Sequence, residues 1–473
     1  MSPFETLLTA LKTDALLQRD GAETLYAQLA GALTEAIRSG ALQPGERLPP
    51  HRELASELGI NITTVTRAMA VLQEQGLIES RPGRGTQVAH PRQPAVQFQS
   101  APSDAPGLID LSVNRPATDA YNKALVALLP RLGNDPRFSG MKDYHPSEGM
   151  PWAREAAAHW LRTLDVPAEA GNLVVTEGAQ HGIACILRAM TAAGDTVLAD
   201  SITYQGINAL CRSLGLNLVG VDGDARGMSP QALSEAIATH APRLLFLVPS
   251  IHNPTAITLD AQRRAELLAV MEPHDDLWLI EDDVYRALLE HRDDTFITHR
   301  PQRTFYVTAL SKCIAPGLRM GFVVAPPAQV QNIAATLRID CWSTSPLNAL
   351  IATRLIEERV SDELIAHQRE ELRARQALLA EHLKGLRYQA SDVGTHAWLH
   401  LPEPWNASRF ARLCQEQGVG VLPGGAFSLR QDQSPNAVRI NLSAAKSREQ
   451  LVQALDVIAR LAQQGHLHMH DRV

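Results

Sequence analysis

Seven short apolar runs separated by helix-length stretches constrain the fold of this chain more than any other feature. The runs lie between residues 173 and 326 and are rich in β-prone residues. Strands that are buried on both faces form continuous apolar runs, and helix-length connections between them are typical of βαβ units. We therefore expect a mostly parallel sheet covered by helices on both faces. The runs are LVVTEG, TVLAD, LNLVGV, RLLFLVPS, LWLIEDD, RTFYVTA and GFVVAP.

The rest of the body has a different pattern. From about residue 329 long helical stretches return, with a few strands such as HAWLHLP and AVRINLS. This pattern predicts a large α/β lobe over about 130–328 and a smaller α+β lobe over about 329–473. The chain has 473 residues. Because single cores stop growing at about 250 to 300 residues, at least one more domain is expected.

The front of the chain supplies that domain. After one amphipathic helix, the segments PHRELASELG and TTVTRAMAVLQEQG form two short helices joined through GIN, and LIESRPGRGTQVA predicts two strands around a turn. This is a winged helix-turn-helix over 21–89. Residues 1–20 are expected to form a helical extension. Residues 90–107 hold four prolines and are expected to form a linker, which could span roughly 50 Å before the body at 108–473.

Composition excludes several classes of protein. The net charge of −7 gives no sign of nonspecific attraction to nucleic acid or membrane, so binding to DNA must rest on local patches. Five scattered cysteines without a C-x-x-C pair indicate neither disulfides nor a metal site. No apolar run reaches the 18 residues of a membrane span and the first twenty residues do not form a signal peptide, so a cytoplasmic protein is expected.

Four of the predicted strands end in polar or glycine-rich segments. In open α/β sheets, ligands bind outside the carboxyl ends of the strands. A lysine placed there can form a Schiff base if its pKa is lowered, and a helix N-terminus can bind phosphate. Taken singly, each segment is also compatible with an ordinary turn or with solvated charges. The segments are VVTEGAQHGI, VPSIHNPTA, LWLIEDDVYRAL and VTALSKCIAPGLRMG.

In this order, the four segments resemble those of the fold type I aminotransferases, which bind pyridoxal 5′-phosphate (PLP), and the resemblance covers residues 108–473. It implies that Lys312 forms the internal aldimine and that Asp282 pairs with the pyridine nitrogen. Asn253 and Tyr285 would hydrogen-bond the ring hydroxyl. The remaining implied site residues are Gly178, Ala179, Gln180, Ser311 and Arg319 around the phosphate, Tyr204 stacked on the ring, Tyr144 reaching the partner subunit's phosphate, and Arg439 gripping a substrate carboxylate.

Two positions depart from the pattern of that family. Ala309 stands where the family usually has a serine three residues before the lysine, so one phosphate hydroxyl is missing unless Thr308 or Ser311 substitutes. Ala256 replaces the glycine of the N-P-T-G motif. Neither change removes a group that the aldimine needs.

The front domain resembles the winged helix-turn-helix of GntR-type transcription factors, through its L-P, R-E-L-A and G-R-G-T motifs. Such a domain places its second helix in the major groove of double-stranded DNA. Residues 21–90 hold six arginines and seven acids, so the basic footprint expected of a DNA-binding domain survives only locally. Ile62 stands where many relatives have an arginine. The residues expected at the DNA are Arg52, Asn61, Thr63, Thr64, Thr66, Arg67, Arg81 and Arg84.

A GntR-type DNA-binding domain joined to an aminotransferase-like body resembles the MocR family of bacterial regulators. The resemblance implies a homodimer, commonly head-to-tail, that binds an operator. Because Lys312, Asp282, Tyr285 and Asn253 stand behind a helix-turn-helix, the leading hypothesis is a PLP-dependent transcriptional regulator. Its effector would be PLP itself or an amino compound that displaces Lys312 to form an external aldimine. A working aminotransferase with an appended DNA-binding domain is the alternative, because Lys312, Asp282 and Arg439 are all present. A DNA-binding protein whose body never binds PLP is a third.

Overall fold

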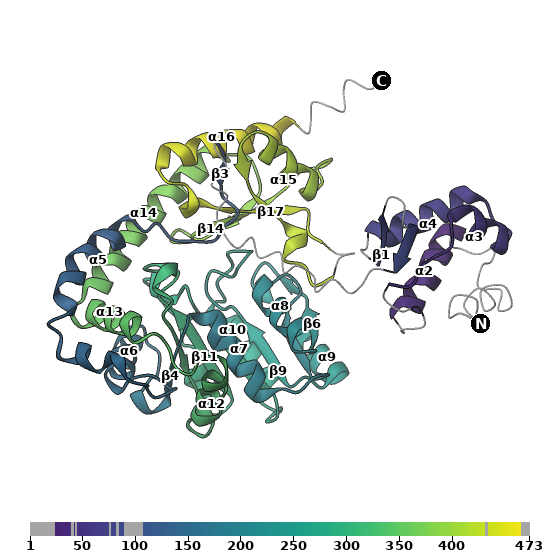
Figure 1. Cartoon of the computed structure of the whole chain (residues 1–473). Coiled ribbons are helices and arrows are strands. Elements are labelled where there is room, and N and C mark those ends of the chain that lie inside the picture. Colours follow the sequence, from purple (N-terminus) through teal and green to yellow (C-terminus); the bar gives the residue numbers. More distant parts are fainter. Residues whose placement is uncertain are drawn as a thin grey trace. The chain divides into compact units, whose positions relative to one another are not determined.

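The computed structural model describes residues 24–38, 42, 45–74, 77–81, 85–88, 107–430 and 434–464. The described residues fall into two compact units, one within residues 1–98 and the other within residues 99–473 (Figure 1). The helix expected within residues 1–20, nearly all of the linker expected over 90–107, and Arg84 lie outside the described residues.

The front unit is the winged helix-turn-helix that the sequence predicts. Its helices close over a core in which Leu29, Leu33 and Val65 are fully buried. Gly59 ends the first helix of the motif with φ 64°, a left-handed conformation that glycine adopts without a steric penalty. The elements are α2 (Leu25–Arg38), α3 (His51–Leu58), α4 (Ile62–Glu74) and the antiparallel pair β1 (Ile78–Arg81) and β2 (Gly85–Val88).

A seven-stranded sheet forms the centre of the large lobe, with strand order β4-β12-β11-β10-β9-β5-β6 (Figure 1). β12 runs antiparallel to both of its neighbours, and the other neighbouring pairs are parallel. Each of the seven apolar runs forms one of these strands. They are β4 (Leu173–Thr176), β5 (Thr196–Asp200), β6 (Asn217–Val221), β9 (Leu244–Leu247), β10 (Trp278–Asp282), β11 (Thr304–Ala309) and β12 (Gly321–Val324).

Helices cover both faces of this sheet, as the unbroken apolar runs predict. In β9, Leu244 and Phe246 lie in one core, whereas Leu245 and Leu247 lie in the core on the opposite face. The first face carries α7 (Ala179–Met190), α8 (Gln205–Ser213) and α12 (Val330–Cys341). The second carries α6 (Pro151–Thr163), α9 (Pro230–His240), α10 (Ala261–Met271) and α13 (Pro346–Glu357).

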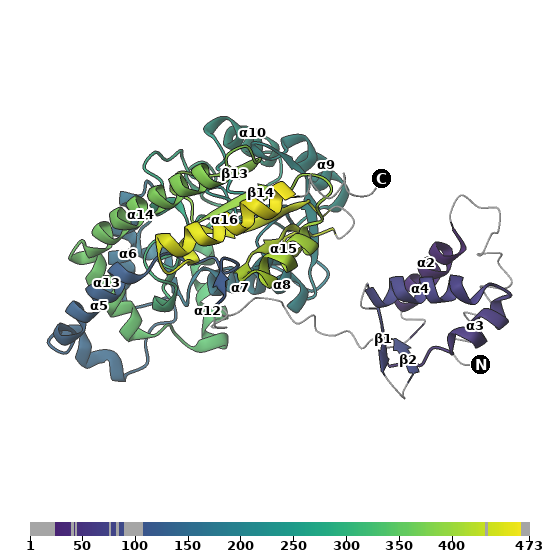
Figure 2. The same cartoon turned by 90° about the horizontal axis from the view of Figure 1, so that it is seen from above.

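A second, antiparallel sheet forms the small lobe, and α15 and α16 lie across it (Figure 2). The first residues of the body belong to this lobe as well, because β3 pairs in parallel with β15. The elements are β13 (Tyr388–Ala390), β14 (His396–His400), β16 (Leu422–Pro423), β17 (Ala437–Asn441), β3 (Ile109–Asp110), β15 (Val419–Gly420), α15 (Ala407–Glu416) and α16 (Arg448–Gln464).

One long helix, α14 (Val360–His382), joins the two lobes. Its Leu364 and Leu372 pack in a core of the large lobe, whereas Leu379 packs in the core of the small lobe. α12 and α13 follow residue 329, where the sequence placed the start of the small lobe, yet their buried side chains pack against the large sheet. We therefore propose that the boundary between the lobes lies within α14.

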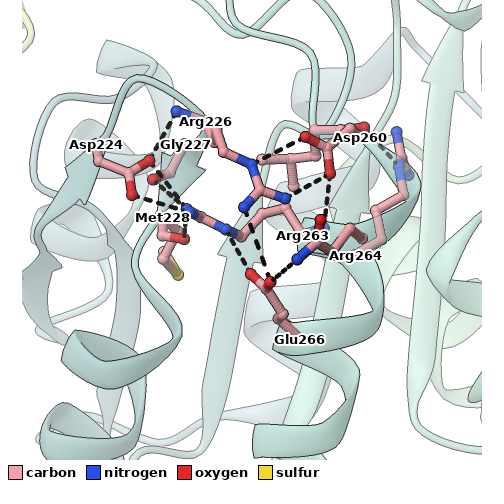
Figure 3. Close-up of polar contacts among 10 residues, drawn as sticks. Asp224, Arg226, Gly227, Met228, Asp260, Arg263, Arg264 and Glu266 are labelled. Atoms are coloured by element: carbon pink, nitrogen blue, oxygen red, sulfur yellow. Dashed lines mark hydrogen bonds and ion pairs between the residues drawn. The ribbon is translucent and has the colours of Figure 1, made fainter.

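An ion-pair network attaches the hairpin β7 (Gly223–Asp224) and β8 (Gly227–Met228) to α10 (Figure 3). Arg263 is 4% exposed and donates to the carbonyls of Gly227 at 3.0 Å and Met228 at 2.7 Å, as well as to the Asp224 carboxylate. Asp260 caps α10 by accepting from the Arg263 backbone N–H, and it also pairs with Arg226. Within the described part of the chain, no helix is long and apolar enough to cross a membrane.

Candidate functional site

Lys312 lies in the turn that follows β11, at the carboxyl edge of the large sheet. The side chain is half-buried, and its Nζ donates to the main-chain oxygen of Asn114 at 2.6 Å. Burial and the nearby charge of Arg439 lower the pKa of Lys312 to about 8. The neutral, nucleophilic form of the amine is therefore easier to reach than in a solvent-exposed lysine.

Asp282 and Tyr285 lie at the end of the neighbouring strand, β10, and both are buried. Among the described residues, the Asp282 Oδ1 atom has no hydrogen-bond partner. Burial together with Asp283 raises the pKa of Asp282 to about 7, and the charge of Lys312 opposes this rise. The Tyr285 hydroxyl accepts from Asn114 Nδ2 at 2.7 Å. A buried carboxylate oxygen without a partner is costly, so the site fits a ligand that brings a donor or a positive charge to Asp282.

Asn253 and Arg439 come from opposite lobes and meet in the site. Asn253 follows β9, and its Oδ1 accepts from Arg439 Nη1 at 2.7 Å. Arg439 lies on β17, donates from Nη2 to the Ser112 carbonyl, and keeps a buried Nε without a partner. Its guanidinium lies 4.9 Å above the ring of Phe427. Burial lowers the pKa of Arg439 to about 10, which still leaves the side chain charged at neutral pH.

The turn before α7 has the shape expected of a phosphate cradle. Gly178 has φ 82°, a left-handed conformation that favours glycine, and a Cβ built on it would lie 2.9 Å from Arg319 Nη2, so a larger residue would be strained and would displace that guanidinium. Ala179 and Gln180 begin α7, and the Gln180 side chain donates to the Gly206 carbonyl at 3.3 Å while its Oε1 has no partner. Arg319 also donates to the Glu177 carbonyl at 2.6 Å.

Two hydroxyls were candidates to replace the serine missing at Ala309. The Thr308 Oγ1 atom is buried and donates to the Asp283 carbonyl at 3.1 Å, so its proton is already used. Ser311 is half-buried directly before Lys312. Of the two, Ser311 is therefore the better candidate.

Tyr204 and Tyr144 occupy different surroundings. Tyr204 precedes α8, and burial, with the nearby Asp282 and Tyr285, raises its pKa above the ordinary value, which places it beside the other site residues. Tyr144 is 86% exposed, and its ring lies 5.1 Å from that of Trp342. Within this one chain, Tyr144 therefore faces outward.

Sequence reasoning missed Asn114, Thr395 and His396. Thr395 Oγ1 donates to Asn114 Oδ1 at 2.9 Å, and His396 Nε2 lies 3.1 Å from the His252 carbonyl. Burial and Arg439 lower the pKa of His396 to about 3, so the ring is neutral. In DLSVNRPATD, Asn114 does not follow one of the seven apolar runs. His396 begins HAWLHLP, a segment that predicts a strand but does not indicate a site residue. Their position in the site depends on contacts between the lobes.

In the front unit, the residues expected at DNA gather around α3 and α4. Arg52, Thr63, Thr66 and Arg67 are exposed, and Thr64 is half-buried. The Asn61 side chain is also exposed, and its Oδ1 accepts from the Thr63 backbone N–H and hydroxyl, both at 2.9 Å, so it caps α4. The Arg67 guanidinium lies 5.3 Å from the centre of the Tyr26 ring, Thr66 Oγ1 lies 3.4 Å from His51 Nδ1, and Arg81 ends β1.

Both units match known families. Residues 106–458 match the family described as aminotransferase class I and II, and residues 25–88 match the bacterial regulatory proteins of the gntR family.

Two relatives match nearly the whole chain. The HTH-type transcriptional regulator YdeF of Bacillus subtilis is 27% identical over 92% of this chain and 94% of its own. The vitamin B6 salvage pathway transcriptional repressor PtsJ of Salmonella typhimurium is 29% identical over 90% of this chain and 96% of its own. Among solved structures, LysN, the α-aminoadipate aminotransferase of Thermus thermophilus, has a TM-score of 0.69 and 24% identity over 77% of this chain and 94% of its own.

Pyridoxal phosphate is the cofactor of this family, and the residues present fit it. The buried, unpartnered Oδ1 of Asp282 suits a protonated ring nitrogen, and the low pKa of Lys312 suits an amine that must attack an aldehyde. The cradle between Gly178 and Arg319 suits a phosphate at the N-terminus of α7.

The expected fold class, a winged helix-turn-helix joined to a type I transferase fold with a smaller α+β lobe, is thereby confirmed. The chain belongs to the class I and II aminotransferases and joins that body to a GntR-type DNA-binding domain, the arrangement of the MocR-family transcriptional regulators.

Proposed function

We propose that this chain binds operator DNA through its front unit and uses its body to sense PLP or an amino compound that competes with Lys312. One observation carries the proposal. Lys312, with its lowered pKa, and the unpartnered carboxylate of Asp282 end neighbouring strands of a chain that also holds a helix-turn-helix. A ligand that binds two arrangements of the protein with different affinity shifts the balance between them, and the DNA affinity follows.

Each site residue would contact a different part of the cofactor. When bound, PLP supplies an aldehyde that condenses with primary amines and a ring that withdraws electrons. Lys312 supplies the competing amine, and the Asn114 carbonyl holds that amine in place. Asp282 keeps a proton on the ring nitrogen. Tyr285 and Asn253 would hydrogen-bond the ring hydroxyl, and Tyr204 would stack on the ring.

The turn before α7 would anchor the phosphate. Backbone N–H groups at the start of α7, together with the side chains of Gln180, Ser311 and Arg319, would surround it. Gly178 has no side chain that would compete with this anion for the position beside Arg319. Arg439 would bind an effector carboxylate as a bidentate pair, in exchange for its present contacts with Asn253 and Ser112.

The front unit would place the N-terminal end of α4 in the major groove of the operator. If Arg52 and Arg67 contact phosphates, replacing either with alanine should reduce the slope of log affinity against log salt by about 0.9. The check is operator binding at several salt concentrations. Unchanged slopes in both variants would contradict this DNA face.

A homodimer completes the proposal. Large apolar side chains are exposed around the end of α12, with Ile339 at 88%, Trp342 at 43% and Leu347 at 42%. Exposed apolar side chains that gather in one region often mark protein contacts. Tyr144 lies against Trp342 in this region, which suits a tyrosine that reaches the site of a partner subunit.

The test combines absorbance with DNA binding. The purified protein should take up PLP with a visible absorbance band, and the Lys312→Ala variant should lack that band. Operator affinity of the wild type should change when PLP or candidate amines are added, and that of Lys312→Ala should not respond to amines. Absence of the band, or an operator affinity that ignores both PLP and the Lys312→Ala substitution, would sink the proposal.

A catalytic aminotransferase is the second candidate. The observation that favours it is Arg439, whose charged guanidinium is buried and keeps one N–H unpartnered in the same site as Lys312. Steady-state transfer of amino groups with a kcat on the order of 10 s⁻¹ would support an enzyme. Half-reactions that stop after one amine exchange would support the sensor.

A further inference from the structure

Asn114 lies between the two lobes and contacts both. Its main-chain oxygen accepts from Lys312 Nζ at 2.6 Å, and its side-chain Nδ2 donates to the Tyr285 hydroxyl at 2.7 Å. Both of these partners belong to the large lobe. Asn114 itself follows β3, which pairs with β15 of the small lobe.

The segment that carries Asn114 is tied to the small lobe along its length. The Leu111 carbonyl accepts from the Asn441 backbone N–H at 2.9 Å, and the Arg115 carbonyl accepts from Ser443 Oγ at 2.5 Å. A shift of the small lobe would therefore move Asn114 relative to Lys312.

The hydrogen bonds of Asn114 also fix which way its amide points. Its Oδ1 accepts from Thr395 Oγ1 at 2.9 Å and from Asn441 Nδ2 at 2.8 Å. With the oxygen occupied by two donors, the amide nitrogen must face Tyr285. An amide nitrogen can only donate, so the Tyr285 oxygen accepts from Asn114 and the Tyr285 proton must go to another acceptor. Burial raises the pKa of Tyr285, and its hydrogen bonds with Asn114 and Thr395 oppose that rise. Because the Thr395 proton goes to Asn114 Oδ1, the Thr395 oxygen is the acceptor that a bound ligand would replace.

We propose that Asn114 is a positioning residue: it directs the Tyr285 proton toward the bound ligand, holds the Lys312 amine, and couples both groups to the small lobe. The inference rests on the proposed function, because the ligand in question is the PLP that Lys312 captures. A merely structural bridge would account for the contacts with Asn441 and Thr395. It would not require the amide to present its nitrogen to a phenol that faces the ligand.

The first test uses the protein without cofactor. Asn114→Asp keeps the shape but replaces the donor with a carboxylate, which accepts the Tyr285 proton and places a negative charge near Lys312. We expect the pH midpoint for labelling of Lys312 by an amine-reactive reagent, followed by mass spectrometry, to rise by about one pH unit. Lys384, which is exposed on the small lobe, serves as the internal reference. An unchanged midpoint overturns the inference.

The second test measures affinity for PLP by absorbance titration. Asn114→Ala and Asn114→Asp should each weaken binding roughly tenfold, because a buried phenol loses the donor that orients it. Asn436→Asp is the matched control, because the Asn436 side chain donates to the carbonyls of Leu401 and Trp405 in the small lobe. The PLP affinity of this variant should equal that of the wild type.

The outcomes separate the two proposals. If the wild type binds no PLP, the proposed function fails. If the wild type binds PLP and both Asn114 variants bind it equally well, only the role of Asn114 fails. Thermal unfolding of each variant shows whether it is folded, and Asn114→Ala, which buries no new charge, keeps the test decisive if Asn114→Asp does not fold.

Discussion

Buried acids, one of them in the site, make the stability of the cofactor-free protein depend on pH. Burial raises the pKa of Asp282, Glu281 and Asp200 to about 7 in the folded chain. Because the folded pKa lies above the unfolded one, each acid stabilises the fold at low pH, and this stabilisation is lost as the pH rises through about 7. The site is therefore built for a cation that replaces the proton on Asp282.

Replacing Asp282 with asparagine should separate binding from stability. Without cofactor, Asp282→Asn should be more stable than the wild type at pH 8 by on the order of 1 kcal/mol, which thermal unfolding would show as a higher unfolding temperature. The difference should shrink toward pH 4. The same variant should bind PLP more weakly. Asp260→Asn is the control of opposite sign, because Arg226 and the α10 backbone lower the pKa of Asp260 to about 2. The ion pair is exposed and asparagine still caps α10, so this variant should be only slightly less stable than the wild type at pH 8. Equal unfolding temperatures of Asp282→Asn and wild type at pH 8 would contradict the argument.

At the scale of single residues, the sequence predicts the site residues that lie at strand ends. It does not predict those whose place in the site depends on contacts between the lobes. Lys312, Asp282 and Asn253 could be found because each follows an apolar run, and the structure brings them together. Asn114 is 198 residues away from Lys312 and 281 away from Thr395, and no local pattern records contacts over such separations. The capping role of Asn61 was missed for another reason: in the sequence, an asparagine that caps a helix looks the same as one that contacts DNA.

At the scale of elements, α4 offers a way to separate these two roles. If Asn61 only caps the helix, Asn61→Ala should destabilise α4 by about 1 kcal/mol, and Asn61→Asp, which still caps, should not. Hydrogen exchange of the α4 amides in the full chain measures this difference. Strong loss of operator affinity in Asn61→Asp without faster exchange would show that Asn61 contacts DNA.

The attachment of the β7–β8 hairpin to α10 depends more on Arg263 than on Arg226 (Figure 3). Arg263 is buried and satisfies two carbonyls of the hairpin, whereas Arg226 is partly exposed and pairs with Asp260 at the surface. Arg263→Met should therefore cost about 1 to 3 kcal/mol of stability, because the carbonyls lose their donors. Arg226→Met should change the unfolding temperature little, since exposed ion pairs contribute little. Equal losses in the two variants, measured by thermal unfolding, would refute this ranking.

At the scale of the whole molecule, local sequence patterns predict the order of elements along the chain but do not specify which lobe each helix packs against. Each apolar run became a strand of the large sheet, because burial on both faces leaves a pattern that local sequence records. The helices α12 and α13 are amphipathic in either lobe, so their sequences do not say which sheet they cover. The pairing of β3 with β15 joins residues about three hundred positions apart, and two-residue strands leave no periodic signal.

The exposed apolar region around α12 predicts how the whole molecule assembles. Ile339→Glu places a charge on a side chain that is 88% exposed in the single chain, so folding should tolerate it. If this region is the dimer interface, the buried charge should shift the protein to monomers in sedimentation experiments and weaken operator binding at low protein concentration. PLP affinity should fall as well if the partner subunit's Tyr144 reaches the phosphate. Gln415→Glu adds the same charge to the exposed face of α15 and should leave the oligomeric state unchanged. A variant Ile339→Glu that sediments like the wild type would place the interface elsewhere.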